Sequence, residues 1–290
     1  MLKLQTPVES GKSKFGISYD DDILMLGSCF TDNMGDKLSG AGFDVCANPF
    51  GTLFNPKSIA NSFFRLKNNV GFTSSDCIQM GAGAGLICSF SHHTAFARAS
   101  EKDFLDNAND SLSKASAFFK DCGKVILTFG TAWCFRLNST GLIVTNCLKR
   151  DAKEFTREMM TMEETFSVIE GMVSSVDKKF IFTVSPIRHL SDGAHGNQLS
   201  KSTLLLAIEE ICRKYPEKCE YFPAYEIMMD ELRDYRFYAE DMSHPSNQAI
   251  DYIWERFCDF ALTEENRRKA ADNLRAAKRS SHRQITTGNI

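Results

Sequence analysis

Three short apolar runs stand out along the chain, and polar, glycine or proline residues follow each of them. The runs are ILML at 23–26, VILTFG at 125–130 and FIFTVSP at 180–186. Runs of this length are typical of buried β-strands, and the last two are rich in β-branched and aromatic residues. We therefore expect three strands that lie inside the protein and are covered on both faces.

Helical patterns separate these runs, because apolar residues recur there every three or four positions. The helical segments are 57–66, 101–119, 161–176 and 200–215. Strands that alternate with helices of this length favour parallel crossover connections. The pattern predicts an α/β fold, in the form of a three-layer α/β/α sandwich with a mainly parallel sheet. Residues 142–150 form an expected insertion that pairs with AWCFR at 132–136.

The domain organisation follows from the absence of repeats, low-complexity blocks and proline-rich linkers. We expect one domain over 1–262. A charged helix begins at about 263, and the polar composition of the last ten or so residues predicts a flexible tail within 263–290.

Composition narrows the classes of function. Hydrophobic residues make up 43% and charged residues 24% of the chain, and the formal net charge is −3. These values are ordinary for a globular protein and argue against a nucleic-acid partner. The N-terminus lacks the pattern of a secretory signal, and no run approaches the roughly 18 apolar residues of a membrane span. We expect a cytoplasmic protein.

Ten cysteines are dispersed along the chain, several of them inside apolar or helical patterns. No C-x-x-C pair occurs, and no cysteine and histidine cluster has the spacing of zinc ligands. We interpret most of these cysteines as small buried residues, and we expect neither a metal nor a cofactor.

Polar residues follow each predicted strand. Ser28 comes after the first strand, Thr131 after the second, and Arg188 with His189 after the third. In a parallel sheet the carboxyl ends of the strands meet at one edge, where ligands bind. The three stretches are therefore expected to converge on one crevice.

A second candidate feature is DMSHPS at 241–246, where Asp241 precedes His244 by three residues and a helical pattern starts near Ser246. A loop of this kind can let Asp241 accept a hydrogen bond from one imidazole nitrogen, which leaves the other free to take a proton from a nucleophile. Alone the pattern is weak, since Asp241 can equally cap the turn.

Together these features resemble a known family. The tetrad Gly27, Ser28, Cys29 and Phe30 is the motif after which the GSCFA family is named, and Thr31 replaces the family's fifth letter, alanine. Further matching blocks are NPFGTLFNPKSIA at 48–60, LTFGTAW at 127–133, TVSPIRHLSDG at 183–193, NQLSKSTLL at 197–205 and the stretch 221–246. The chain is thus similar to a bacterial-type family related to the SGNH, or GDSL-like, hydrolases, over nearly its whole length to about 260.

The SGNH resemblance implies a flavodoxin-like fold and a triad. Ser28 would be the nucleophile, His244 the general base and Asp241 its orienting carboxylate. Cys29 is intrinsically the better nucleophile. Successive residues of a turn point in different directions, however, and the SGNH layout places the residue directly after the glycine at the site. We therefore assign Ser28 as the nucleophile and Cys29 as a packing residue.

The oxyanion hole departs from the SGNH pattern. The expected donors are the backbone N–H of Ser28, that of Gly51 and a third group near Thr131 and Ala132. SGNH hydrolases have an asparagine in the third block, where Ala132 stands here. Losing such a donor typically costs about 10²- to 10³-fold in rate.

Five further side chains are candidates for substrate binding: Asn48, Asn55, His92, His93 and Arg188. The two asparagines can equally form turns beside prolines. Adjacent histidines on a strand point to opposite faces, so only one can face the site. Arg188 can bind a carboxylate or phosphate, or anchor the acidic residues near Asp230.

The sequence therefore favours a serine esterase or deacylase whose partner is a small-molecule or carbohydrate ester. One alternative is an O-acyltransferase with the same triad. Another is a non-catalytic carbohydrate-binding protein on a decayed hydrolase fold.

Overall fold

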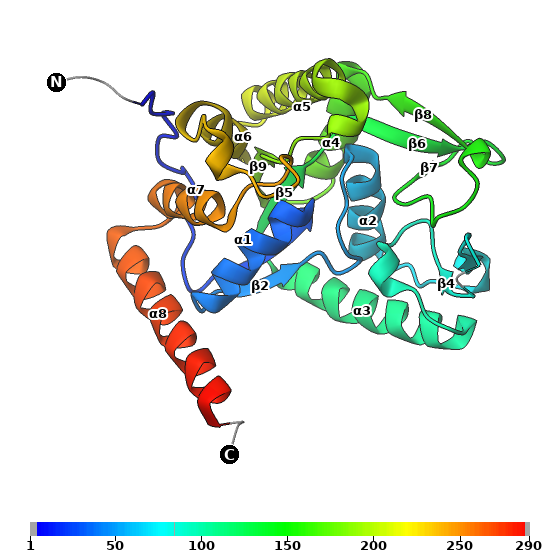
Figure 1. The fold of residues 1–290 in the computed structure, drawn as a ribbon, viewed down its shortest axis with the longest axis horizontal. Helices are drawn as coiled ribbons and strands as arrows, with labels where there is room; N and C mark the ends of the chain where they lie inside the picture. Colours follow the sequence, from blue (N-terminus) through cyan, green and yellow to red (C-terminus); the bar gives the residue numbers. More distant parts are fainter. Residues whose placement is uncertain (1–4, 84, 288–290) are drawn as a thin grey trace.

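The chain folds around a five-stranded sheet in which all neighbouring strands are parallel, in the order β10–β9–β5–β1–β2 (Figure 1). The computed structural model describes residues 5–83 and 85–287. The strands are β1 (Asp22–Gly27), β2 (Asp44–Ala47), β5 (Lys124–Phe129), β9 (Lys179–Val184) and β10 (Cys219–Tyr221). The predicted α/β/α sandwich with a mainly parallel sheet is confirmed.

The strand order indicates where a ligand-binding crevice is expected. The chain leaves β1 to form β2 on one side and returns to form β5 on the other. The connections therefore diverge at the carboxyl ends of β1 and β5, the position where open parallel sheets bind ligands.

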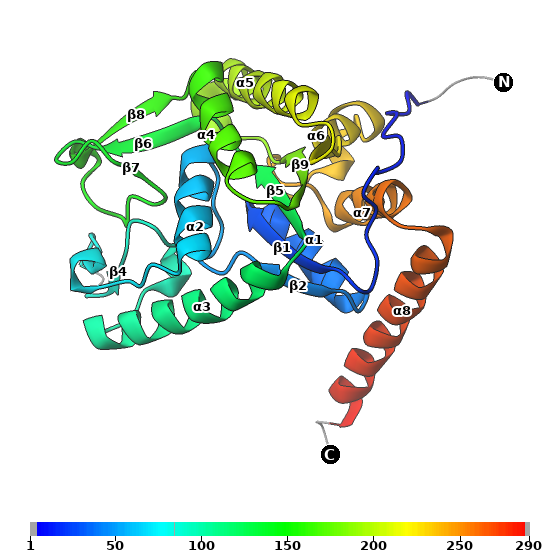
Figure 2. The same cartoon turned by 180° about the vertical axis from the view of Figure 1, so that it is seen from behind.

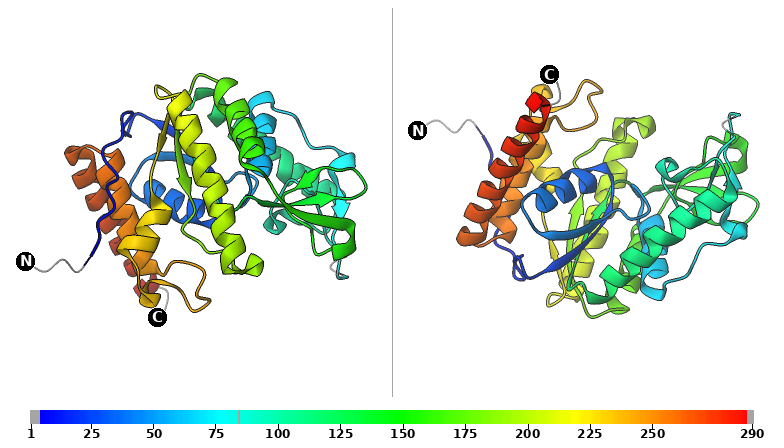
Figure 3. Two further views of the ribbon diagram at one scale, coloured as in Figure 1. Left: turned by 90° about the horizontal axis from the view of Figure 1, so that it is seen from above. Right: turned by 90° about the horizontal axis from the view of Figure 1, so that it is seen from below.

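Helices cover both faces of the sheet (Figures 2 and 3). One face packs against α2 (Pro56–Asn68), α3 (Glu101–Asp121), α4 (Met162–Ser174) and α5 (Gly193–Lys214). The other packs against α1 (Cys29–Gly40), α6 (Ala224–Glu226) and α7 (Asn247–Ala261). The terminal helix α8 (Glu264–Thr287) lies beside α1, where Asn273 donates a hydrogen bond of 2.7 Å to the carbonyl of Ala41.

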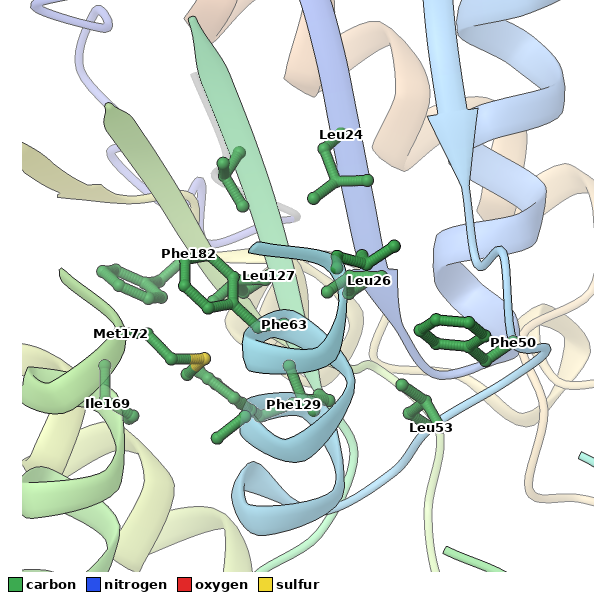
Figure 4. Packing of buried hydrophobic residues seen from close by; sticks show 14 of the residues in the cluster. Leu24, Leu26, Phe50, Leu53, Phe63, Leu127, Phe129, Ile169, Met172 and Phe182 are labelled. Carbon is green, nitrogen blue, oxygen red and sulfur yellow. The ribbon is translucent and has the colours of Figure 1, made fainter. Parts of the chain in front are cut away.

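The pleat of β1 explains why its side chains are apolar on both sides. Leu24 and Leu26 point into one core, whereas Ile23 and Met25 point into the other. Figure 4 shows Leu24 and Leu26 on the α2 side, close to Phe63 and Phe182. Burial of each such side chain contributes about 1.5–3 kcal/mol.

Two edge strands escape prediction from the pattern. Strand β2 is only four residues long and half-exposed, and β10 is three residues long, so neither forms an apolar run. The predicted pairing of the insertion is confirmed: β6 (Trp133–Leu137) pairs with β7 (Ile143–Val144) and with β8 (Phe155–Met159). A separate antiparallel pair joins β3 (Ile78–Gln79) and β4 (Ile87–Cys88).

Two helix boundaries also differ from the expectation. Helix α5 begins at Gly193, two turns before the predicted start. The apolar pattern did not reveal these two turns, because their residues are mostly polar. Helix α8 continues to Thr287, beyond the expected start of an irregular tail, and 288–290 lie outside the described residues. Within the described chain, none of the helices combines the length and apolar character that a bilayer crossing requires.

Gly27 closes the carboxyl end of β1 with a φ of 155°. A Cβ atom there would lie 2.3 Å from the carbonyl oxygen of Thr128 and 2.6 Å from Oγ1 of Thr31. One of these atoms belongs to the backbone of the neighbouring strand β5, which cannot move aside without breaking the sheet. Only glycine fits at this position.

We predict that Gly27→Ala destabilises the protein by about 2–3 kcal/mol, because the added methyl group overlaps the backbone of β5. The midpoint of urea unfolding measures the loss. Gly123→Ala is the matched control, since a Cβ at Gly123 meets no atom within 4 Å. Equal midpoints for the two variants would contradict the steric argument.

Candidate active site

Ser28 lies at the amino end of α1 with its side chain turned into the protein. It is the N-cap residue, its Oγ accepts a hydrogen bond from the N–H of Phe30, and the residue has no exposed surface. The hydroxyl donates to Oγ of Ser185, which follows β9, over 3.1 Å. These contacts are those of a helix cap. Among the described residues, the hydroxyl of Ser28, the predicted nucleophile, forms these hydrogen bonds and none with His244.

Cys29 occupies the position expected of Ser28. It is the first residue of α1, it is partly exposed, and its Sγ lies 3.6 Å from Nε2 of His244. Successive residues do point in different directions, as we expected, but the inward residue is Ser28 and the outward one is Cys29.

The loop before α7 holds the imidazole. Nδ1 of His244 lies 2.5 Å from Oδ2 of Asp241, and Oδ1 of the same carboxylate accepts hydrogen bonds of 2.9 Å from the N–H groups of Ser243 and His244. These two backbone bonds, followed by the imidazole, lower the pKa of Asp241 to about 2. The carboxylate therefore fixes both the loop and the tautomer in which Nε2 faces Cys29.

The resting thiol is protonated at neutral pH. Burial is the largest cause that raises the pKa of Cys29, and the charges of Asp32 and Asp241 add to it. The N–H groups of Cys29 and Phe30 act in the opposite direction. The thiol thus needs a base at the moment of reaction, and His244 is placed to act as one.

The predicted oxyanion donors are all engaged in internal hydrogen bonds. Ser28 N–H donates to the carbonyl of Thr128, Gly51 N–H to Asn48, and Thr131 N–H to Phe54. The Ala132 N–H and the Thr131 hydroxyl both bond Oγ of Ser200. In this arrangement those groups hold the strand ends in place. Cys29 is the first residue of α1, so its N–H has no acceptor within the helix. This N–H lies at the positive end of the helix dipole.

Asn48 and Asn55 prove to be framework residues. Oδ1 of Asn48 accepts from the N–H of Gly27 at 2.8 Å, and its Nδ2 donates to Oδ1 of Asp32 at 2.6 Å, so it ties the end of β1 to the first turn of α1. Its φ of 43° is a left-handed value that asparagine tolerates. Asn55 caps α2, since its Oδ1 accepts from the N–H of Ser58.

The two adjacent histidines lie in a turn rather than on a strand, and they occupy different environments. His92 is fully buried among phenylalanines, its Nδ1 bonds Oγ of Ser89, and burial lowers its pKa to about 3. His93 packs against Gly51, and its electrostatic effect on Asp32 is to lower the pKa of that carboxyl. Only His93 therefore lies near the site.

Arg188 lies beside the loop that carries His244. Its backbone N–H donates to the carbonyl of Ser243 at 3.0 Å, and its guanidinium carbon lies 5.7 Å from the centre of the Tyr238 ring. Over residues 5–83 and 85–287, no carboxylate forms an ion pair with this guanidinium, so the suggested anchor to the acidic residues near Asp230 is not made.

Two residues of the site, Asp32 and Ser185, escaped prediction from the sequence. Asp32 sits one helical turn after Cys29, and Ser185 is the partner of Ser28. The position directly after a strand end was the available signal for Ser185, whereas no local pattern marks Asp32. His189, which the sequence did place after the third strand, follows β9; its Nε2 is buried without a hydrogen-bond partner, and burial lowers its pKa to about 3.

In the part of the chain that the structure describes, no three histidine, cysteine, aspartate or glutamate side chains converge as a metal site.

Comparisons with known proteins agree with the family resemblance. The model of the GSCFA family matches residues 22–257. Among solved structures, a Bacteroides fragilis protein named as a "putative acylhydrolase" aligns with 11% identity and a TM-score of 0.42, over 87% of this chain and 89% of that chain. A likeness at this level carries no argument about activity. No curated protein matches.

We predict that the Asp241 carboxyl titrates near pH 2, as measured by NMR of carboxyl-labelled protein. A lowered pKa means that the bonds to the carboxylate stabilise the loop above about pH 4 and are lost as the pH falls through 2. In His244→Ala the backbone N–H groups remain, so most of the shift should persist. A return to an ordinary value in that variant would contradict the assigned cause.

Proposed function

Because this chain belongs to the GSCFA family, we propose that it is an acyl-transfer enzyme that hydrolyses esters and that Cys29 of the family motif is its nucleophile. One observation carries the proposal. Sγ of Cys29 lies 3.6 Å from Nε2 of His244, whose Nδ1 lies 2.5 Å from Asp241. This is the order of nucleophile, base and orienting carboxylate in a catalytic triad.

The chemistry takes two steps. His244 Nε2 takes the thiol proton as Sγ of Cys29 attacks the ester carbonyl, and a C–S bond forms. The C–O bond then breaks, and the imidazolium gives its proton to the departing alcohol. A water molecule, deprotonated by the same nitrogen, attacks the thioester, which releases the acid and restores the thiol. The N–H of Cys29 is the donor best placed for the oxyanion, as in other triads where the nucleophile's own N–H serves.

The position of the site supports this proposal. Cys29 follows β1 and therefore lies at the strand-order reversal, where open parallel sheets bind ligands. Ser28, which we first assigned as the nucleophile, supports α1 as its cap instead. A serine mechanism requires its hydroxyl to give up the hydrogen bonds with Ser185 and Phe30 and to form one with the imidazole.

The proposed substrate class is the one that the sequence favoured, a small-molecule or carbohydrate ester. Side chains of Asp241 and His244 keep about half of their surface exposed, so an ester on a large or branched alcohol, such as an O-acylated carbohydrate, can reach them. The same openness admits an alcohol in place of water, which is the O-acyltransferase alternative. Arg188 lies beside the loop and forms no ion pair with a carboxylate of the described residues, which favours a substrate that carries a carboxylate or phosphate.

The nucleophile can be tested by substitution. We predict that Cys29→Ala abolishes hydrolysis of p-nitrophenyl acetate by at least about 10³-fold, since no other group attacks the carbonyl. Ser28→Ala should remain active within about tenfold while losing about 1 kcal/mol of stability as a lost helix cap. Ester hydrolysis and thermal unfolding of both variants provide the measurement.

Iodoacetamide labelling followed by mass spectrometry is the independent control, because nine other free cysteines serve as internal references. Cys29 should react first, and His244→Ala should slow its reaction. Full activity in Cys29→Ala together with loss in Ser28→Ala would restore the serine assignment. Inactivity toward all esters, with ordinary Cys29 reactivity and retained sugar binding, would favour a non-catalytic binding protein.

The role of Arg188 is separable from the chemistry. We predict that Arg188→Ala raises KM about tenfold for an ester with an anionic acyl or alcohol group and leaves KM for a neutral ester unchanged. Arg188→Lys should recover part of the difference, because lysine keeps the charge but not the planar donor pair. Equal effects on both esters would show that the arginine only supports the Ser243 loop.

A further inference from the structure

Asp32 lies beside the proposed nucleophile, although its negative charge opposes ionisation of the thiol. It follows Cys29 by three residues on α1, and residues three apart on a helix are neighbours, with Cβ atoms about 5–6 Å apart. Burial is the main cause that raises the pKa of Cys29, and the charge of Asp32 raises it further. A carboxylate at this position makes the thiol harder to ionise, so its presence calls for another explanation.

Asn48 holds this carboxylate in place and leaves one of its oxygen atoms free. Nδ2 of Asn48 donates a hydrogen bond of 2.6 Å to Oδ1 of Asp32, while Oδ1 of Asn48 accepts from the N–H of Gly27 at 2.8 Å. Among the described residues, none donates a hydrogen bond to Oδ2 of Asp32, and this atom is not one of the buried atoms that lack a partner. Oδ2 therefore faces solvent as a fixed acceptor beside Cys29.

His93 presents a hydrogen-bond donor on the other side of Asn48. Its Nδ1 accepts a hydrogen bond of 3.2 Å from the N–H of Ala95, so the proton of the neutral imidazole lies on Nε2. Within residues 5–83 and 85–287, Nε2 of His93 has no acceptor and, unlike Nε2 of His92, it is not buried. The ring can thus donate Nε2–H to a ligand.

The turn at Gly51 brings His93 close to Asn48. A Cβ atom at Gly51 would overlap Cβ of His93, and the φ of 78° is one that glycine adopts readily. The N–H of His93 donates to the carbonyl of Phe50 at 3.0 Å. The N–H of Gly51 donates to the carbonyl of Asn48 at 2.8 Å. His93 and Asp32 are therefore anchored to the same turn.

The electrostatics agree with these contacts. Burial raises the pKa of the Asp32 carboxyl, whereas the hydrogen bond from Asn48 and the charge of His93 lower it. In the described part of the chain no hydrogen bond joins Asp32 to His93. The acceptor and the donor are thus close to each other, and both are free to bind a ligand.

We propose that Asp32 and His93 form a hydroxyl-binding subsite beside Cys29, and that the enzyme prefers esters whose alcohol carries a further free hydroxyl group, as a sugar or another polyol does. The proposal rests on the function proposed for Cys29. A hydroxyl group is both a donor and an acceptor, so it can donate to Oδ2 of Asp32 and accept from Nε2–H of His93. An alkyl group in the same place leaves both of these groups unpaired, which costs binding energy.

The test compares 2-hydroxyethyl acetate with propyl acetate, because the two esters differ only in a hydroxyl group that replaces a methyl group. The wild type should hydrolyse the hydroxyl ester with a kcat/KM at least about tenfold higher. Asp32→Asn can keep the bond from Asn48 but puts a donor in place of the free acceptor, and His93→Phe keeps a ring but removes the donor. Each variant should lose most of the preference. Both esters react with the same thiol, so a change in its reactivity cancels in the ratio.

Asp36→Asn is the matched control, since it removes a carboxylate from an exposed position of the same helix, and it should keep the wild-type preference. Equal kcat/KM values for the two esters in the wild type would overturn the subsite. An unchanged preference in either Asp32→Asn or His93→Phe would overturn it as well.

A binding measurement separates the subsite from the proposed function. In Cys29→Ala, 2-hydroxyethyl acetate should shift the NMR signals of the His93 ring at concentrations about tenfold lower than propyl acetate does. Equal affinities would overturn the subsite, even if the wild type hydrolyses neither ester. Hydrolysis that persists in Cys29→Ala would instead refute the proposed nucleophile, and the ratio of the two esters in the Asp32 and His93 variants would still decide the subsite.

Discussion

The site depends on the close contact between Gly27 and the backbone of β5. No side chain fits between the end of β1 and the carbonyl of Thr128, so the residue at position 27 must be glycine. The φ of 155° directs the next residue into the protein as the cap of α1, and the helix then carries the following residue to the surface. The direction of Ser28 and Cys29 is therefore set by the packing of two strands and not by the chemistry of either side chain.

Hydrogen bonds that a hydrolase of the SGNH type would offer to a substrate are used here to join strand ends to helices. Gly51 and Asn48 close the turn after β2, while Thr131 and Ala132 bind Ser200 of α5. Buried polar groups left unpaired are costly, so each of these bonds rigidifies the loop that contains it. The rim of the site is thus stiff near the sheet, whereas the loop with Asp241 and His244 remains exposed to solvent.

The fold could be predicted from the sequence to the extent that burial leaves a pattern. The runs at β1, β5 and β9 are apolar because both faces are covered, and the amphipathic helices between them fixed the parallel crossovers. The edge strand β2 could not be recognised, since a short half-exposed strand has no such run. The contact of Asp241 with His244 is local and could be anticipated from a spacing of three. Which of two adjacent residues meets His244, 215 positions away, depends on the turn at Gly27, and no local pattern contains that information.

The electrostatics of the site follow from the same geometry. The helix dipole normally lowers the pKa of a thiol at the amino end of a helix. Here burial, together with the charges of Asp32 and Asp241, raises the pKa of Cys29 instead. The thiolate is therefore a transient species, formed as His244 accepts the proton. A nucleophile that is neutral at rest resists oxidation and alkylation better than a permanent thiolate, because both reactions require the ionised sulfur. Reactivity then depends on groups that act only when the charge forms, such as the imidazole of His244, whose Nε2 lies 3.6 Å from the sulfur.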